Sequence, residues 1–548
     1  MLSMIFAYIK QYKLNFIVIM ICSTASTFAS VAIPYVTGMY IDKLVDIRNL
    51  NEVYYFTIAL TVIIFISIGM SYIKSVFFAK FNNRVLFDFI DSVMDHVKAL
   101  PLSYFRNKDI IYLNDRINSD CSSIVNFVTN NIINVIMNII SLISYFLLIY
   151  KISNKMLIAL LCIIPLYLFA YNMFSRPLYN INMKYKEEKN KYISKMLQQI
   201  SNIKFIKLHS LYQVVKNQFQ KSFEKVFNTA IKTVKISYLF YCADNIIRTI
   251  LTIILFFWGG IEIIHKRMSV GNFTIINRYF SMIFTSISYF FMLGQSYQDS
   301  LVSYNRIRDI MRESIENNGS LNIDDINIIE LKNVSFFYEN RKIIVNFNYK
   351  FRKGNIYYIV GANGIGKSTF VSLLVGIEKN YKGSIFYDDI NIDDIDLYNA
   401  RRNLVGIVEQ SPKFISGTLK YNLTYNENIE EEYLLRYFKK YNAYEFLCKL
   451  PDGFDTLLEN GNLVLSDGEK QKISIIRAVI KNPKILILDE PTTALDTNSI
   501  AILKRNLIDL KKDKIIIIIT HDYNLIDKDD SIIDMGKVND SSNKECLQ

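Results

Sequence analysis

Residues 355–368 read Asn-Ile-Tyr-Tyr-Ile-Val-Gly-Ala-Asn-Gly-Ile-Gly-Lys-Ser. The first six are mostly apolar, β-branched or aromatic, which predicts a buried strand. The next eight match G-x-x-x-x-G-K-S, and a helical pattern follows them. In this setting the glycines let backbone N–H groups surround phosphate oxygens, Lys367 neutralises the terminal phosphates, and Ser368 ligates Mg²⁺. The stretch therefore predicts an α/β domain with a phosphate-binding loop.

Two apolar runs on the C-terminal side of this loop end in polar residues. Residues 485–488 precede Asp489 and Glu490, and residues 515–519 precede Thr520 and His521. Uniformly apolar strands suit the middle of a parallel sheet, whose carboxyl edge faces the ligand crevice. We therefore assign Asp489 to Mg²⁺, Glu490 to orienting and deprotonating the attacking water, and His521 to a γ-phosphate contact. Without the phosphate loop, a solvated turn and a packing histidine would be the better interpretations.

Gln410 closes another predicted strand, at residues 405–409. Its neutral amide can reach Mg²⁺ or the attacking water, although by itself it would be uninformative. Gln410 is included among the candidate site residues because the other three strand ends already indicate a nucleotide site.

The N-terminal half of the chain is much more apolar. The chain has 548 residues, 51% of them hydrophobic, with 19 glycines and eight prolines, which excludes a disordered or collagenous protein. Six apolar stretches are long enough to cross about 30 Å of hydrocarbon. They lie near 14–36, 53–78, 132–152, 155–174, 236–264 and 274–298. A multi-pass membrane protein is predicted, a soluble ATPase is excluded, and the first stretch is too long for a typical signal peptide.

Positive charge is unevenly distributed between the segments that join these spans. The formal net charge is +12. With a cytoplasmic N-terminus, the inner segments carry 21 Lys and Arg residues and the outer segments carry six. The positive-inside rule thus places the N-terminus and the ATPase domain in the cytoplasm. The basicity belongs to an inner membrane face, so no nucleic-acid partner is inferred, and the Ile-, Asn-, Lys- and Tyr-rich composition favours a bacterial plasma membrane.

The domain organisation follows from changes in pattern along the chain. Apolar residues at three- and four-residue spacing predict helices over 79–100 and 184–235 that extend from the membrane into the cytosol. A polar stretch at 315–328 predicts a linker. It separates a transmembrane domain over 1–314 from an α/β P-loop ATPase domain over 329–548. The six cysteines show no C-x-x-C spacing and are interpreted as reduced packing residues.

In this order, the phosphate loop, Gln410, the acidic strand end and His521 resemble the ABC transporter family. The second domain is similar to its nucleotide-binding domain, with Walker A at 361–368, Walker B at 485–490 and a D-loop that contains Asp496. The resemblance implies ATP and Mg²⁺ as ligands, with adenine stacked on Tyr338. The implied ATP-binding residues are Tyr338, Gly361, Asn363, Gly364, Gly366, Lys367, Ser368, Thr369 and Gln410, and the Mg²⁺ residues are Ser368, Gln410 and Asp489.

The six spans with long inner helices are similar to the exporter type, in which the permease precedes the ATPase. Further points of similarity are the run Leu-Pro-Leu-Ser-Tyr-Phe at 100–105, which also interrupts the first inner helix, and Ser-Val-Gly-Asn at 269–272. The resemblance implies a dimer of such halves, in which each ATP lies between one Walker A loop and the signature of the partner. Ser466, Asp467, Gly468 and Glu469 would make this contact in trans.

That signature departs from the family's Leu-Ser-Gly-Gly-Gln and reads Leu-Ser-Asp-Gly-Glu at 465–469. Ser466 and Glu469 have capping-box spacing, so a well-capped helix start is the local alternative. A carboxylate about 4 Å from a γ-phosphate oxygen would cost about 4 kcal/mol per charge pair at an effective dielectric constant of about 20. With Glu490 and His521 intact, the hypothesis is one half of an asymmetric heterodimer, and a slow homodimer is the alternative.

The predicted function is ATP-driven export of an amphipathic substrate by alternating access. An ATP-gated channel or a non-transporting sensor with weak hydrolysis is the alternative, and an importer is disfavoured because importers resembling this family usually carry permease and ATPase on separate chains. Asp244 and Arg248 lie four residues apart on the fifth span, hence on one helical face. They either neutralise each other as an ion pair or contact the substrate. Peptide, lipid and drug all stay open as cargo, and no peptidase domain is seen before the first span.

Overall fold

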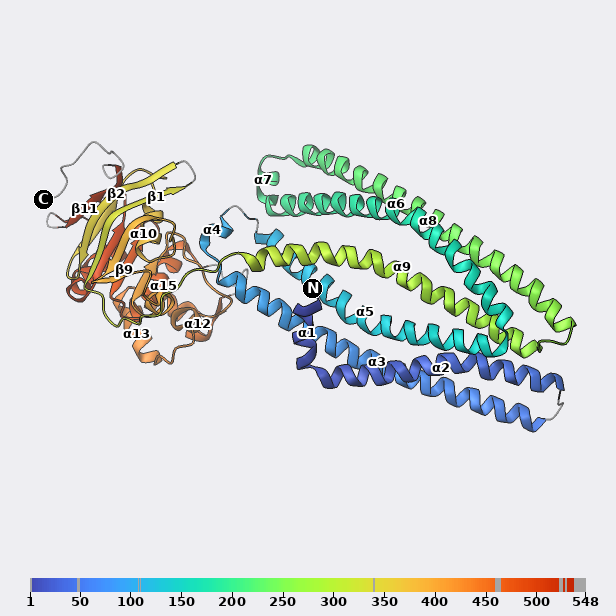
Figure 1. Ribbon diagram of the computed structural model, residues 1–548. Helices are drawn as coiled ribbons and strands as arrows, with labels where there is room; N and C mark the ends of the chain where they lie inside the picture. Colours follow the sequence, from blue (N-terminus) through green and yellow to red (C-terminus); the bar gives the residue numbers. More distant parts are fainter. Residues whose placement is uncertain are drawn as a thin grey trace. The chain divides into compact units, whose positions relative to one another are not determined.

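The computed structural model describes residues 2–46, 50–106, 108, 110–338, 341–458, 465–521, 526–527 and 530–536. The chain divides into two compact units. Unit 1 comprises Met1–Ala99 and Asn107–Glu313, and unit 2 comprises Leu100–Arg106 and Ser314–Gln548. Figure 1 shows unit 1 as long helices and unit 2 as sheets with shorter helices. The chain is thus a helical region followed by a sheet-containing domain.

Within the described residues, six long helices make up most of unit 1. They are α2 (Lys13–Asp46), α3 (Leu50–Lys98), α5 (Ile110–Ile152), α6 (Asn154–Ser201), α8 (Tyr212–Ile264) and α9 (Val270–Arg312), accompanied by the short α1 (Leu2–Gln11) and α7 (Ile203–Leu208). Each long helix contains one of the six predicted apolar stretches. By length and apolarity, α2, α3, α5 and α8 are able to cross a membrane. A total of six spans stays a prediction.

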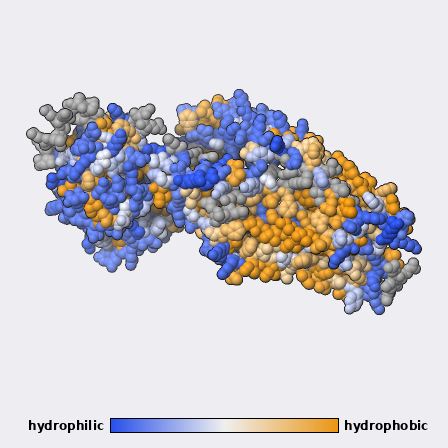
Figure 2. Space-filling model, viewed as in Figure 1, coloured by the Kyte–Doolittle hydropathy of each residue, from blue (hydrophilic) through white to orange (hydrophobic). Residues whose placement is uncertain are grey.

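The surface of unit 1 is apolar along these helices. On α3, large hydrophobic side chains are exposed at residues 54, 55, 58, 62, 65, 66, 68 and 72. Figure 2 shows apolar residues over much of the visible face of the helical unit. Exposed apolar patches of this extent are unusual in soluble monomers and are typical of a lipid-facing surface. Unit 1 is therefore the membrane region of the chain.

The inner helical extensions differ in one respect from the prediction. Helix α3 runs to Lys98, and Pro101 leads into the short α4 (Leu102–Phe105), as expected for a break at this point. The pattern over 184–235 is interrupted, because α6 ends at Ser201 and α8 begins at Tyr212. Ser210, with φ of 50°, lies in the left-handed region and allows the chain to reverse. Helices α6 and α8 then pack side by side (Figure 1).

Helices α2 and α9 approach each other closely at the start of α9. Asp42 of α2 accepts hydrogen bonds from Ser269 Oγ and from the Gly271 backbone N–H, both at 2.6 Å. A carboxylate at a helix N-terminus is stabilised by the helix dipole and by the N–H groups it accepts from. A Cβ atom at Gly271 would overlap both the backbone oxygen of Gly38 and the carboxyl group of Asp42. The contact therefore depends on glycine at position 271.

We expect Gly271→Ala to lower the melting temperature of the full chain in lipid nanodiscs by several degrees. The added methyl group must push α2 away from α9, and overpacking of this kind costs about 1–3 kcal/mol. Gly260→Ala on α8 is the matched control, because no described atom beyond the adjoining helix backbone and the neighbouring residues lies within 4 Å of the Cβ position there. Equal melting temperatures for the two variants would contradict the close contact.

Within the described part of unit 2, two larger sheets and one small strand pair are present. The antiparallel sheet has the order β2 (Arg341–Arg352), β1 (Ile328–Tyr338), β4 (Lys382–Tyr387), β5 (Ile390–Asn391). The parallel sheet has the order β11 (Ser531–Asp534), β3 (Ile356–Val360), β10 (Ile515–Ile519), β9 (Ile485–Asp489), β6 (Val405–Val408). The pair joins β7 (Gly417–Thr418) to β8 (Leu457–Leu458).

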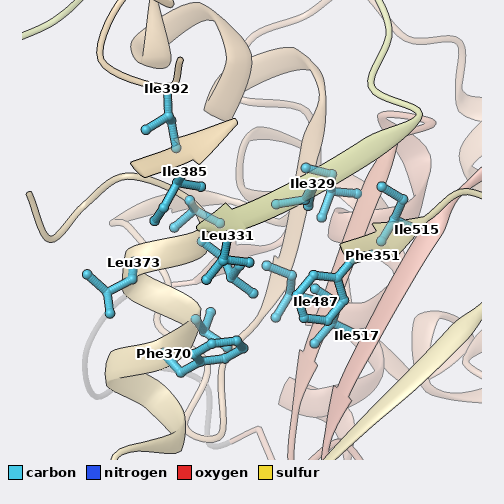
Figure 3. Close-up of a cluster of buried hydrophobic side chains, with 14 of the residues drawn as sticks. Ile329, Leu331, Phe351, Phe370, Leu373, Ile385, Ile392, Ile487, Ile515 and Ile517 are labelled. Carbon is cyan, nitrogen blue, oxygen red and sulfur yellow. The ribbon is translucent and has the colours of Figure 1, made fainter. Parts of the chain in front are cut away.

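Helices cover both faces of the parallel sheet. They are α10 (Lys367–Leu374), α11 (Leu397–Asn403), α12 (Leu419–Thr424), α13 (Glu431–Lys440), α14 (Tyr444–Lys449), α15 (Asp467–Ile480) and α16 (Thr497–Leu510), with 3₁₀ turns at Gly453–Asp455 and Lys511–Asp513. Ile515 and Ile517 face a core shared with the antiparallel sheet and Phe370 of α10 (Figure 3). Ile516 and Ile518 face a second core with α13, α15 and α16. Burial on both faces explains why these strands are uniformly apolar.

Candidate functional site

The site lies at the carboxyl edge of the parallel sheet. Strands β3, β9 and β10 are paired in parallel register, so that Ile519 lies between Ile359 and Asp489. The loops that follow these strands therefore leave the sheet at the same edge. They carry the phosphate loop, Glu490 and His521, the residues that were predicted to meet there.

Lys367 lies at the centre of this group. Its Nζ donates to the Gly361 carbonyl at 2.7 Å and lies 2.5 Å from Nε2 of His521. The residue is only 7% exposed. Burial lowers the pKa of Lys367 from its ordinary value, and the negative charges of Glu490 and Asp489 partly oppose this shift. An anion placed beside this buried ammonium would be strongly favoured.

The loop around Lys367 is shaped by glycines. Gly361, Gly364 and Gly366 have φ values of 148°, 75° and 115°, in the region that only glycine adopts readily. A Cβ atom at Gly366 would in addition overlap the side chain of Ile343. Helix α10 begins at Lys367, and no described side chain caps its N-terminal N–H groups. Helix N–H groups without a side-chain cap, the helix dipole and a buried ammonium together fit the phosphates of a nucleotide.

Glu490 has a backbone conformation that is rare for a residue other than glycine, with φ of 47°. Its N–H donates to the Ile519 carbonyl at 2.9 Å, which fixes the turn to the neighbouring strand. Nε2 of Gln410 donates to Oε2 of Glu490 at 2.8 Å. The other carboxylate oxygen, Oε1, lies 3.2 Å from Nε2 of His521. Such conformations are typical of functional sites, where the surrounding structure holds the residue in place.

His521 Nε2 faces two partners but satisfies one at a time. When unprotonated, it accepts from the ammonium of Lys367, and when protonated it donates to Glu490. The side chain is 40% exposed, so it is open to a ligand.

The structure brings together two of the three predicted Mg²⁺ residues. Ser368 Oγ donates to Oδ2 of Asp489 at 3.3 Å. Burial raises the pKa of Asp489, and the nearby charge of Glu490 adds to the shift. Hydroxyl and carboxylate oxygens are ligands that Mg²⁺ prefers, and a divalent cation would stabilise the buried charge, so the pair fits this ion. The amide of Gln410, the third predicted residue, donates a hydrogen bond to Glu490, and its role as a Mg²⁺ ligand stays a prediction.

Comparison with known proteins agrees with this arrangement. The family model described as the ABC transporter transmembrane region matches residues 16–287, and the model described as ABC transporter matches residues 344–493. The chain belongs to the ABC transporter family. It has the domain organisation of an exporter-type half-transporter, with one transmembrane region fused to one nucleotide-binding domain.

Relatives of this ABC half-transporter include a lipid A-core flippase and an alpha-hemolysin translocation protein. The "ATP-dependent lipid A-core flippase" of Syntrophus aciditrophicus (strain SB) is 24% identical over 533 residues, which cover 96% of this chain and 88% of the relative. The "Alpha-hemolysin translocation ATP-binding protein HlyB" of Escherichia coli is 25% identical over 548 residues, covering 98% and 77%. The solved "Structure of a bacterial Atm1-family ABC exporter with ATP bound" has a TM-score of 0.83 at 20% identity and covers 96% of this chain and 94% of its own, a likeness of fold.

In this half-transporter, the residue predicted to stack on adenine lies beside the phosphate loop. The hydroxyl groups of Tyr338 and Thr369 are 3.1 Å apart. Arg106, from the segment between α3 and α5, lies with its guanidinium carbon 4.0 Å from the centroid of the Tyr338 ring. Arg106 also forms an ion pair with Glu378. The sequence reasoning missed Arg106 and Glu378, since neither has a motif that marks it.

The altered signature forms the start of α15. Ser466 Oγ accepts from the Glu469 N–H, and Oε2 of Glu469 accepts from the Ser466 N–H at 2.8 Å, which completes a capping box. Asp467 is 86% exposed at its side chain and pairs with Lys470 at 3.0 Å. A Cβ atom at Gly468 would lie 2.8 Å from the carbonyl oxygen of Ala494, next to the D-loop. Two carboxylates therefore occupy the N-terminus of this helix.

One further predicted residue, Asp496 of the D-loop, has a structural partner. Asp496 pairs with Lys472 of α15 at 3.6 Å. The nearby Ser499 side chain and the charge of Lys472 lower the pKa of Asp496. Together with the contact at Gly468, this ion pair connects the D-loop to the signature helix.

The pair predicted on the fifth span is formed in α8. Arg248 Nε donates to Asp244 Oδ2 at 2.8 Å, and another nitrogen of Arg248 donates to Ser288 Oγ of α9 at 2.8 Å. The pair thus joins α8 to α9. A role of Asp244 and Arg248 in the substrate path stays a prediction.

Proposed function

We propose that the chain is one half of a dimeric exporter that uses ATP to move an amphipathic substrate across the bacterial plasma membrane. The observation that supports this most directly is the convergence of Lys367, His521, Glu490 and Gln410 above one glycine-rich loop. The names of two relatives refer to a flippase for lipid A-core and to translocation of alpha-hemolysin. Both are consistent with an amphipathic cargo, and peptide, lipid and drug-like compounds all fall within this class.

Each residue of the site has a chemical task in this proposal. Lys367 and the N–H groups of the loop bind the phosphates, and His521 donates a hydrogen bond to the terminal one. Glu490 accepts a proton from the attacking water, while Gln410 holds the carboxylate in position. Mg²⁺ bound by Ser368 and Asp489 would supply charge neutralisation at the phosphates.

Alternating access is the proposed coupling. Binding of ATP between two nucleotide-binding domains closes them, and the helical extensions transmit the closure to the membrane region. The transmembrane helices then change from an inward-facing to an outward-facing arrangement, and hydrolysis resets the cycle. The charge distribution supports a cytoplasmic position for the N-terminus and the ATPase domain.

Transport is tested with the full chain in inside-out lipid vesicles. We expect ATP-dependent accumulation of those lipids, peptides or drug-like compounds that also stimulate ATP hydrolysis, and no accumulation with the Glu490→Gln variant. Ion conductance across the same vesicles is measured in parallel. ATP-dependent conductance without accumulation of any cargo would instead support the ATP-gated channel, and nucleotide binding without transport or conductance would support the sensor.

The altered signature supports the proposal of an asymmetric heterodimer. The carboxylates of Asp467 and Glu469 lie where a helix N-terminus would otherwise face the γ-phosphate bound by the partner. Like charge at that place weakens the trans contact. This chain would then supply a competent Walker site, while its partner supplies an unaltered signature.

We expect the double change Asp467→Gly and Glu469→Gln to raise ATP hydrolysis by the chain purified alone about tenfold. The change removes two negative charges that would repel the partner's ATP in a homodimer. Native mass spectrometry monitors the dimer, and Glu445→Gln, a change in the first turn of α14, is the control. A homodimer of the unaltered chain that already hydrolyses ATP at several turnovers per second would contradict the heterodimer.

A further inference from the structure

Unit 2 contains seven residues that come from between two helices of unit 1. The segment Leu100–Arg106 follows α3 and precedes α5 in the chain, but it clusters with the nucleotide-binding domain. It includes α4 and ends at Arg106. Arg106 contacts Tyr338, the residue proposed to stack on adenine.

The Arg106 side chain lies on the ring of Tyr338. Its guanidinium carbon is 4.0 Å from the ring centroid, and NH2 donates to the Tyr338 hydroxyl at 3.0 Å. This is a close cation–π geometry, and planar guanidinium groups stack on aromatic faces much as bases do. The guanidinium of Arg106 therefore occupies one side of the Tyr338 ring.

Glu378 holds the guanidinium in this place. The residue is 4% exposed and pairs with NH2 of Arg106, whose side chain is 37% exposed. A buried carboxylate that loses its cation is left with an uncompensated charge, which is strongly destabilising. The pair with Glu378 therefore keeps Arg106 near Tyr338 while leaving the guanidinium accessible from solvent.

We propose that Arg106 competes with the nucleotide base for the ring of Tyr338, so that ATP affinity depends on the position of Leu100–Arg106. The proposal rests on the adenine-stacking role given to Tyr338 under the proposed function. Binding of the base displaces the guanidinium from the ring, and withdrawal of the segment frees the ring for the base. By linkage, a bound base in turn weakens the contact between the segment Leu100–Arg106 and Tyr338. In the chain, this segment follows α3 and precedes α5.

The test compares two ligands on the full chain in lipid nanodiscs by isothermal titration calorimetry. Mg·ATP has a base, whereas Mg·tripolyphosphate carries the phosphates alone. We expect Arg106→Gln to tighten binding of Mg·ATP about fivefold, because a partly desolvated cation–π contact no longer has to be broken. Binding of Mg·tripolyphosphate should change by less than about twofold. Glu378→Gln, which loosens the anchor, should tighten Mg·ATP binding in the same direction.

A double-mutant cycle shows whether the effect passes through the ring. In a Tyr338→Ala background, Arg106→Gln should no longer change the affinity for Mg·ATP. Arg402→Gln is the matched control, since Arg402 is 68% exposed and pairs with Glu427. Unchanged or weaker Mg·ATP binding by Arg106→Gln, or an equal change for both ligands, would overturn the competition. Failure of the unaltered chain to bind either ligand would overturn the proposed function as well.

Discussion

Replacement of Lys367 by alanine is expected to weaken Mg·ATP binding by at least about a hundredfold. The buried ammonium belongs to the phosphate loop itself, and it donates a hydrogen bond to the Gly361 carbonyl. Hydrogen bonds to charged groups contribute about 1.5–3 kcal/mol each, so the loss of two such bonds to phosphate corresponds to this factor or more. Calorimetric titration of the full chain with Mg·ATP measures the change.

Lys420→Ala is the control for Lys367→Ala. Lys420 pairs with Glu431 at 2.8 Å in a solvent-exposed ion pair, so its removal should leave nucleotide affinity unchanged. A melting temperature measured without nucleotide shows whether each variant is folded. Unaltered Mg·ATP binding by folded Lys367→Ala would exclude the loop as the phosphate site.

The second large effect is expected from Glu490→Gln, which should reduce ATP hydrolysis by about 10²–10⁴-fold. This is the usual contribution of a positioned general base, and an amide cannot accept the proton of the attacking water. The substitution preserves the side-chain length and an oxygen that accepts from Gln410. Glutamine also adopts the left-handed backbone conformation of position 490 no less readily than glutamate. Steady-state phosphate release measures the rate, and binding of Mg·ATP should stay within about threefold.

Glu427→Gln is a suitable comparison for Glu490→Gln, because Glu427 pairs with Arg402 at the surface. Hydrolysis by Glu490→Gln at the rate of the unaltered chain would mean that another group activates the water. Loss of nucleotide binding together with hydrolysis would instead assign Glu490 to binding.

The nucleotide site could be predicted from sequence because its geometry follows from the sheet. In a parallel sheet every carboxyl end lies at one edge, so a polar residue after each apolar run must come out beside the others. Lys367, Glu490 and His521 meet for this reason, although 154 residues separate the lysine from the histidine. The capping box of Ser466 and Glu469 was equally predictable, because it depends only on local spacing.

Other features could not be predicted, because they depend on contacts between distant elements. Arg106 and Tyr338 are separated by 232 residues. The sequence pattern does not indicate that a segment between two long helices contacts the end of β1. The left-handed conformation of Glu490 could not be predicted from sequence either, since glutamate does not favour this backbone region. The break between α6 and α8 lies in a sequence rich in helix formers, where the reversal at Ser210 overrides propensity.

The membership of Leu100–Arg106 in unit 2 has a practical consequence for biochemistry with fragments. A soluble piece that starts at Ser314 would retain the whole phosphate loop but would lack the cation that neutralises Glu378. It should therefore melt at a lower temperature than the same domain inside the intact chain. Kinetic constants measured on such a fragment would therefore not include any influence of the helices of unit 1.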